Sequence, residues 1–167
     1  GYLHADAQGG AAAFQRGSDV TLRNISATSN MALGGNAPNG NPGGAFGGAF
    51  FTEDADLALY DGFIFDNIAR GGDGIIDDDG RSRGSGYARG GGVATADGEA
   101  LVVRTSVINN ISRGGNGQIH TGSAAGGGIG SVRYTGDFMV RIMNSVVADN
   151  IAQLGNGTKI VGGGGGG

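Results

Sequence analysis

The 167-residue sequence contains no cysteine, which excludes disulfide scaffolds, thiolate catalysis and cysteine-based zinc sites. Charged residues make up only 16% of the chain and aromatic residues 7%, so we expect one modest domain without a large core of bulky side chains. The apolar runs are too short to cross a bilayer, so we expect no membrane insertion by this segment. The net charge of −4 provides no basic surface for phosphate backbones, so we expect no nucleic-acid partner.

Glycine, by contrast, is in excess, with 39 of the 167 residues. Such a chain is either a disordered, low-complexity segment or a repeat that uses glycine at fixed positions. Four asparagines, Asn30, Asn67, Asn110 and Asn150, recur 37, 43 and 40 residues apart. This spacing favours a repeat.

The residues around the four asparagines fall into columns. Small or apolar residues stand three, eight and ten positions before each asparagine, and Asn36, Asp73, Asn116 or Asn156 stands six positions after it. The alternation of apolar with more exposed residue types upstream has the period of two that is typical of a strand with one buried face. The glycine clusters at the joints exclude long helices.

Each module opens with a glycine cluster. A short strand, a turn, a second strand, a bend, a short strand ending at the asparagine and a glycine-rich loop follow. We place the modules at residues 9–42, 43–89, 90–125 and 126–161, with 162–167 starting a fifth. The sequence therefore predicts one all-β domain, residues 1–167, that forms a parallel β-solenoid of about four coils with glycine-rich loops.

The same geometry gives the asparagines a structural role. Stacked coils bring Asn30, Asn67, Asn110 and Asn150 over one another, so their side-chain amides are expected to form a ladder. Each hydrogen bond of such a ladder contributes about 0.5 to 1.5 kcal/mol to stability.

Two recurring motifs carry a resemblance to a known family. One is the glycine-rich motif, as in Gly44-Ala45-Phe46 and Gly91-Gly92-Val93, and the other ends in asparagine, as in Ile64-Phe-Asp-Asn67 and Val107-Ile-Asn-Asn110. Over residues 9–162 the chain resembles right-handed parallel β-helix proteins of the pectin-lyase-like kind. It is most similar to glycine-rich surface and autotransporter passenger proteins with GGA(I/L/V) and FxxN repeats. The resemblance implies a right-handed β-helix, an extracellular or cell-surface location and a structural or adhesive role rather than an enzymatic one.

One acidic stretch has the composition of a cation site. Asp73, Asp77, Asp78 and Asp79 lie in the longest glycine-rich loop, and clustered carboxylates suit hard cations such as calcium. The alternative is a solvated loop in which these carboxylates pair loosely with Arg81 and Arg83. Calcium is the only cofactor that the sequence suggests.

Polysaccharide cleavage is the enzymatic use of a β-helix that must be considered, and it needs two or three converging carboxylates. One column, six residues before the asparagines, contains Asp61, Arg104 and Asn144. Because that column contains a single acid, we expect no enzyme. A polysaccharide-binding or polysaccharide-cleaving β-helix is the alternative. His4 and His120 are isolated loop residues without a partner at ligand spacing.

The ends of the repeat suggest the mode of action. The chain starts at Gly1 without a leader, so we expect a mature product or an excised piece. Neither end shows a polar cap, and uncapped strand edges are templates for further strands. We therefore expect head-to-tail self-association into a filament, with a piece of a longer surface passenger as the alternative. Surface glycans are the other partner that we consider.

Overall fold

The computed structural model describes residues 5–37, 41–74, 84–132 and 139–157. Within these ranges every regular element is a β-strand, and there is no helix that could span a membrane. The strands form five parallel sheets of four strands each. The chain passes through all five sheets in order and then begins again, which makes a β-solenoid of about three turns. The expected all-β parallel solenoid is confirmed.

We call one passage of the chain through the five sheets a rung. The first rung consists of β1 (Ala7–Gln8), β2 (Ala12–Gln15), β3 (Asp19–Arg23), β4 (Ser26–Thr28) and β5 (Met31–Leu33). The second consists of β6 (Ala45–Phe46), β7 (Phe50–Glu53), β8 (Asp56–Tyr60), β9 (Phe63–Phe65) and β10 (Ile68–Arg70). The third consists of β11 (Ala88–Arg89), β12 (Val93–Ala96), β13 (Glu99–Val103), β14 (Ser106–Ile108) and β15 (Ile111–Arg113). The fourth consists of β16 (Ala124–Ala125), β17 (Ile129–Val132), β18 (Met139–Met143), β19 (Val146–Ala148) and β20 (Ile151–Gln153).

The register of the sheets follows the columns of the sequence. Leu22 pairs with Leu59, Leu59 with Val102, and Val102 with Ile142 in the sheet of β3, β8, β13 and β18. Likewise the residues three before the asparagines, from Ala27 to Val147, pair in the sheet of β4, β9, β14 and β19. The alternation with a period of two therefore predicted the pairing register.

Each rung nevertheless has five strands, whereas the sequence predicted three. The two that were missed are the three-residue strand that follows each asparagine and the two-residue strand that precedes each glycine cluster. Both are too short to show an alternating pattern, and glycine flanks them. The segment after the asparagine, expected to be a glycine-rich loop, begins with a strand in every rung.

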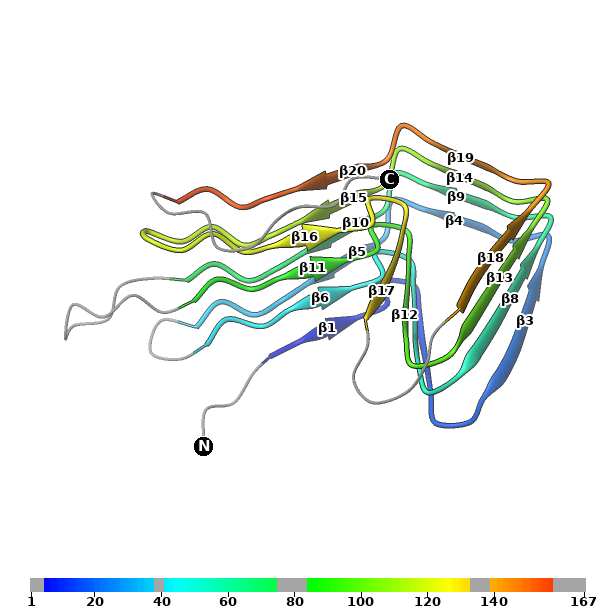
Figure 1. The fold of residues 1–167 in the computed structure, drawn as a ribbon, viewed down its shortest axis with the longest axis horizontal. Helices are drawn as coiled ribbons and strands as arrows, with labels where there is room; N and C mark the ends of the chain where they lie inside the picture. The colour runs from blue at the N-terminus through cyan, green and yellow to red at the C-terminus, as the bar shows by residue number, and fades with distance from the viewer. Residues whose placement is uncertain (1–4, 38–40, 75–83, 133–138, 158–167) are drawn as a thin grey trace.

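The five sheets form two parts that join at the asparagines (Figure 1). The sheets containing β2, β3 and β4 enclose a three-sided body, and those containing β1 and β5 lie against each other as a flat arm. The core of the body is made of Leu, Ile, Val and Phe side chains, among them Leu57, Leu59, Ile64, Val102 and Val107. Near the body, the arm is filled mostly by small side chains, among them those of Ala32, Ala45, Ala69 and Ala88. Ser112, in the column of Ala69, is buried in the same way.

Farther out, the two layers of the arm touch backbone to backbone. A series of hydrogen bonds runs from Gly155 to Ala5 along the stack, alternating between the outgoing and the returning layer through Gly122, Gly115, Gly86, Gly72, Gly43 and Gly35. We call these seven glycines the glycine zipper. A Cβ atom on Gly115 would lie 1.9 Å from the carbonyl oxygen of Gly72, so a side chain cannot fit there. This explains much of the glycine excess.

The sharp corners of the body are made by residues in the left-handed region of backbone conformation. At the corner between the second and third strands of a rung these are Arg16, Asp54 and Asp97, and at the next corner Asn24, Asp61, Arg104 and Asn144. At the corner before each ladder asparagine they are Ser29, Asp66, Asn109 and Asp149. Asparagine and aspartate tolerate this conformation better than other non-glycine residues, which accounts for their recurrence at the corners.

Candidate functional site

The four repeated asparagines lie at the junction of body and arm, and their side chains join the rungs. The Nδ2 atom of Asn30 donates to Oδ1 of Asn67 at 2.9 Å, Asn67 to Asn110 at 2.9 Å, and Asn110 to Asn150 at 3.0 Å. The same Oδ1 atoms also accept the backbone N–H of the asparagine one rung earlier. Asn67 and Asn110 are completely buried. The arrangement is a continuous amide ladder along the solenoid axis.

The glycine clusters make room for this ladder. An added Cβ on Gly92 would lie 3.2 Å from Cγ of Asn110, and one on Gly128 would lie 2.7 Å from Cγ of Asn150. In the third and fourth rungs the glycine cluster and the ladder asparagine therefore pack against each other, whereas Ala11 and Ala49 take the position of Gly92 in the first two rungs.

A second polar ladder runs through the column six residues after the asparagines, at the arm. The backbone N–H of Asp73 donates to Oδ1 of Asn36, that of Asn116 to Oδ1 of Asp73, and that of Asn156 to Oδ1 of Asn116. Here the side chain belongs to the earlier rung, whereas in the first ladder it belongs to the later rung. The sequence showed the column but gave no sign of this reversal.

Asp73, one of the four expected calcium ligands, is part of this second ladder. Its carboxylate also accepts both contacts of the Arg70 guanidinium, at 2.8 and 2.7 Å. Asp77, Asp78 and Asp79 lie outside the described residues. Among the described residues no group of three or more His, Asp or Glu side chains is placed to hold a metal ion. The calcium site stays a prediction.

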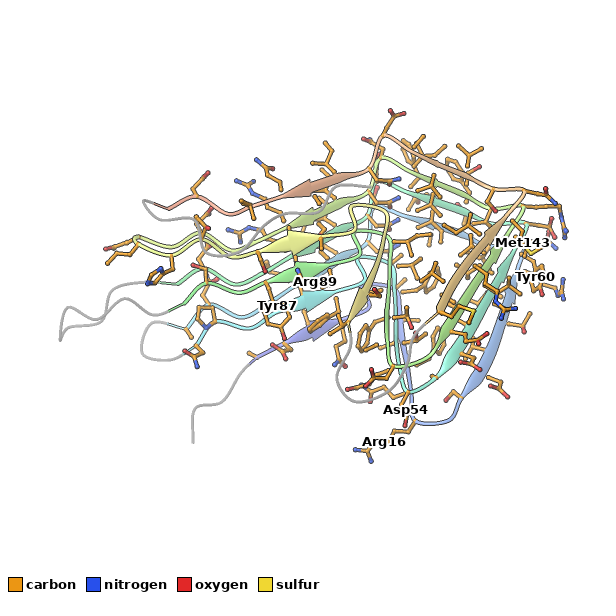
Figure 2. The ribbon with its side chains drawn as sticks, viewed as in Figure 1. Arg16, Asp54, Tyr60, Tyr87, Arg89 and Met143 are labelled. Carbon is orange, nitrogen blue, oxygen red and sulfur yellow. The ribbon has the colours of Figure 1, made fainter. Side chains whose placement is uncertain are left out.

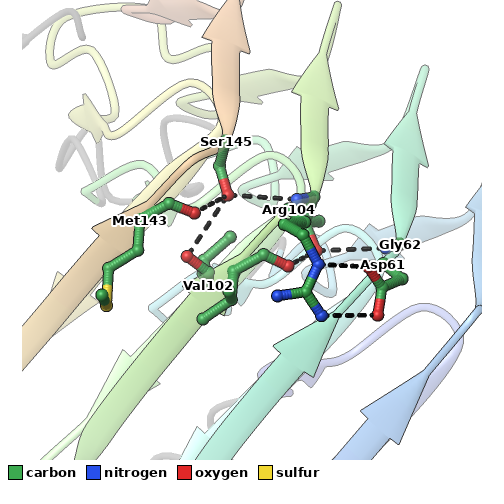
Figure 3. Close-up of polar contacts among 8 residues, drawn as sticks. Asp61, Gly62, Val102, Arg104, Met143 and Ser145 are labelled. Atoms are coloured by element: carbon green, nitrogen blue, oxygen red, sulfur yellow. Dashed lines mark hydrogen bonds and ion pairs between the residues drawn. The ribbon is translucent and has the colours of Figure 1, made fainter.

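The column considered for polysaccharide cleavage lies at a corner of the body (Figure 3). Arg104 donates from Nε to Oδ1 of Asp61 at 2.6 Å and from Nη2 to Oδ2 at 2.9 Å. This hydrogen bonding, aided by the charge of Arg104, lowers the pKa of the Asp61 carboxyl below its ordinary value. A carboxyl held ionised in this way is a poor proton donor. The column serves to turn the chain and to tie two rungs together.

Hydroxyl groups next to the ion pair join the second rung to the third and the third rung to the fourth. The backbone N–H of Gly62 donates to Oγ1 of Thr105 at 3.1 Å, and that of Thr105 donates to Oγ of Ser145 at 3.0 Å (Figure 3). At this corner, as in the asparagine ladder, a side-chain oxygen of the later rung accepts a backbone N–H of the earlier rung.

The angle between arm and body holds an aromatic cluster that the sequence did not reveal. The rings of Phe46 and Phe51 are completely buried, and their centroids are 5.3 Å apart. Tyr87 packs edge-on against Phe46, also at 5.3 Å. Arg89 lies 5.7 Å from the Tyr87 ring, and its burial lowers the pKa of the guanidinium (Figure 2). The cluster packs Phe46 of β6, in the arm, against Phe51 of β7, in the body.

Of the two histidines, His4 lies outside the described residues. His120 is half-buried and lines a cavity of about 340 Å³ together with Ser85, Tyr87 and Thr121. Its backbone oxygen accepts a hydrogen bond from Oγ of Ser85 at 2.5 Å.

Another aromatic pair points outward from the body. Phe63 and Phe65 stack with centroids 5.3 Å apart and ring planes inclined by 15°, and Phe63 is exposed. One corner away, the guanidinium of Arg23 lies 4.1 Å from the centre of the Tyr60 ring. These residues form an exposed aromatic surface on the first and second rungs.

The fourth rung exposes residues whose counterparts in other rungs are buried. Ile142 is 47% exposed and Val147 is 37% exposed, whereas Val102 and Val107, one rung earlier in the same columns, are completely buried. In the described residues each strand of the fourth rung pairs on one side only. The same holds for the first rung.

No protein-family profile matches the sequence, and neither a curated protein nor a solved structure is significantly similar to it.

Proposed function

We propose that this protein is a structural and adhesive β-solenoid of the cell exterior that acts by stacking head to tail into a filament. The observation that carries the proposal is that, within the described residues, the strands of the first and fourth rungs pair on one side only. Strands that are paired on one side only present free backbone donors and acceptors, and such edges take up further strands.

The exposed side chains of the fourth rung support the same proposal. Ile142, Val146, Val147 and Ile151 are each more than one third exposed, although all four of their counterparts in the third rung are buried or half-buried. Covering this face with another rung would remove apolar surface from water, which is favourable by about 25 cal/mol per Å². A head-to-tail contact does not close on itself, so its product is a filament.

The proposal also includes a relationship to a known kind of protein. The glycine-rich motif and the motif ending in asparagine support a right-handed β-helix related to glycine-rich surface or autotransporter passenger proteins. The first residue of the second motif, such as Ile64 or Val107, packs in the core of the body, which gives the motif a physical basis. If the chain is instead a piece of a longer surface passenger, the strands of its end rungs would pair with further rungs of the same polypeptide.

Sedimentation velocity of the purified chain over a range of concentrations tests the proposal, with electron microscopy of the same samples. We expect the sedimentation coefficient to rise with concentration, together with filaments of uniform width. A chain that stays monomeric throughout the range would contradict it.

Glycan binding is a second candidate function, favoured by the exposed Phe63–Phe65 stack. The flat face of such a pair can pack against the C–H groups of a sugar ring, and Arg104 lies near the same corner. Retention on a panel of immobilised polysaccharides, without release of reducing ends, would indicate a binding module. Phe63→Ala should reduce that retention, and Phe14→Ala, a half-buried residue of another sheet, is the control.

A further inference from the structure

We propose that the fourth rung of one copy sits on the first rung of a second copy in the register that relates neighbouring rungs within the chain, so that Asn150 lies over Asn30. The inference rests on the proposed function and adds the contacts and the register of the joint. It follows from the direction of the two polar ladders and from the columns at the end rungs.

The first ladder ends with matching groups. Within the chain, each ladder asparagine donates its backbone N–H and Nδ2 to Oδ1 of the next rung. Among the described residues, Asn150 has no such acceptor for its backbone N–H, and Oδ1 of Asn30 accepts no hydrogen bond. Asn30 of a second copy, placed as the next rung, supplies this acceptor through its Oδ1 atom.

The backbone hydrogen bonds beside this ladder run in the opposite direction along the stack, and their donors and acceptors are also complementary at the joint. The N–H of Ile68 donates to the oxygen of Asn30, that of Ile111 to Asn67, and that of Ile151 to Asn110, at 2.8 to 2.9 Å. In the proposed joint, Met31 of the second copy donates in the same way to the oxygen of Asn150.

The second ladder provides an independent match, because its polarity is reversed. Asn156 presents an Oδ1 atom that accepts no hydrogen bond among the described residues, and the backbone N–H of Asn36 has no acceptor there. Asn36 of the second copy can therefore donate to Asn156. Donors and acceptors of both ladders are complementary between the two ends of one chain, in a single register.

The same register places apolar side chains over apolar side chains. Ile142 lies over Leu22, Val147 over Ala27 and Ile151 over Met31. The exposed parts of Ile142 and Val147 would then be covered, as the side chains of the same columns are inside the stack.

No like charges meet in these columns among the described residues. Arg141 lies over Thr21, and Met143 lies over Arg23. At the corner, Asp149 lies over Ser29, whose hydroxyl can donate to the carboxylate. A slip by one residue would instead turn the apolar side chains of the fourth rung away from the core of the next copy.

Cysteine cross-linking tests the register directly, because the chain contains no cysteine of its own. Ser26 and Val146 occupy one exposed column, so the proposed joint brings them onto neighbouring strands. Adjacent strands lie about 4.8 Å apart, within the range of about 4.4 to 6.8 Å between Cα atoms that a disulfide accepts. Within one chain the two positions are separated by two intervening rungs, so they cannot react with each other. The double variant Ser26→Cys, Val146→Cys should give a ladder of covalent oligomers on a non-reducing gel after mild oxidation.

The matched control is Ser26→Cys, Ala148→Cys, which moves one cysteine two residues along β19. In the proposed register these Cα atoms are about 8 Å apart, too far for a disulfide, so we expect at least about tenfold less cross-linking. If wild-type protein forms filaments but the control pair cross-links as well as the first pair, the register is wrong and the proposed function stands. If wild-type protein stays monomeric and neither pair cross-links, both fail.

A substitution at the joint provides a second readout. Asn156→Ala removes a side-chain acceptor that no donor of the described residues uses, so it should weaken assembly about two- to twelvefold and leave unfolding of the monomer unchanged. Asn116→Ala removes the equivalent acceptor inside the stack and should lower monomer stability instead. Equal effects of the two variants on assembly would contradict the proposed contact of Asn156.

Discussion

The Oδ1 atom of Asn110 accepts two hydrogen bonds from Asn67, one from its backbone N–H at 3.0 Å and one from its Nδ2 atom at 2.9 Å. Both residues are completely buried. One side-chain oxygen therefore satisfies two donors that have no access to water. Its removal would leave the backbone N–H of Asn67 without an acceptor, and Nδ2 of Asn67 would keep only its hydrogen bond to the oxygen of Ala27.

Asn110→Ala should consequently lower the free energy of unfolding by about 3 kcal/mol, because buried donors without acceptors are costly. Asn30→Ala removes only the Nδ2 donor of the first rung and keeps the backbone N–H, so it leaves no buried donor unpaired and should cost only about 1 kcal/mol. Urea denaturation followed by circular dichroism measures both values. Equal losses of unfolding free energy would show that burial of the asparagine does not determine the cost of removing its side chain.

The glycine zipper predicts a sharp contrast between two glycine-to-alanine changes. A Cβ on Gly115 would lie 1.9 Å from the oxygen of Gly72, whereas one on Gly84 would meet no atom within 4 Å. Gly115→Ala should lower the free energy of unfolding by about 3 kcal/mol, because the second and third rungs of the arm must move apart. Gly84→Ala should be tolerated. Thermal unfolding of the two variants checks this, and a neutral Gly115→Ala would contradict the close contact of these rungs.

Two phenylalanines of the same rung should differ in their contributions to stability. Phe51 is completely buried in the angle between arm and body, and Phe51→Ala should cost about 3 to 5 kcal/mol. Phe63 is exposed and stacks on Phe65, so Phe63→Ala should cost about 1 kcal/mol. The midpoints of urea denaturation give the comparison, which fails if the exposed ring contributes as much as the buried one.

The Asp61–Arg104 ion pair predicts a pH dependence. Because hydrogen bonding by Arg104 lowers the pKa of Asp61 in the folded state, the pair adds stability above the ordinary pKa of an aspartate and loses it as the pH falls through the lowered value. Asp61→Asn should therefore lower the unfolding midpoint slightly at neutral pH, since the pair is exposed, and the difference should vanish in acid. A difference that widens as the pH falls would contradict this sign.

The columns of the sequence predicted the parallel solenoid and the pairing register of its longer strands. A period of two over five residues, as in Glu99–Val103, is a sufficient signal because one face of the strand is buried. The very short strands, such as Ala45–Phe46, were not predictable, because two residues next to glycine carry no periodicity.

The site was predictable only in part, for a related reason. Repetition at a similar spacing identified the column of the ladder asparagines and the column of Asn36. It did not indicate the direction of the hydrogen bonds, which depends on which rung contributes the side chain. The aromatic cluster of Phe46, Phe51 and Tyr87 was not predictable from the repeat. The other rungs do not have an aromatic residue at the positions that correspond to Phe46 and Phe51. Asp61 and Arg104 were considered as a possible groove, whereas their left-handed backbone conformation is a requirement of the corner.

The glycine zipper also accommodates connections of unequal length between rungs. The segments between the last strand of one rung and the first strand of the next, residues 34–44, 71–87 and 114–123, differ in length although the glycine contacts inside them repeat. Gly86 donates to Gly72 as Gly122 donates to Gly115, although the first two glycines are farther apart in the sequence. The number of residues that join two rungs can therefore vary while the bonded glycines keep the layers together.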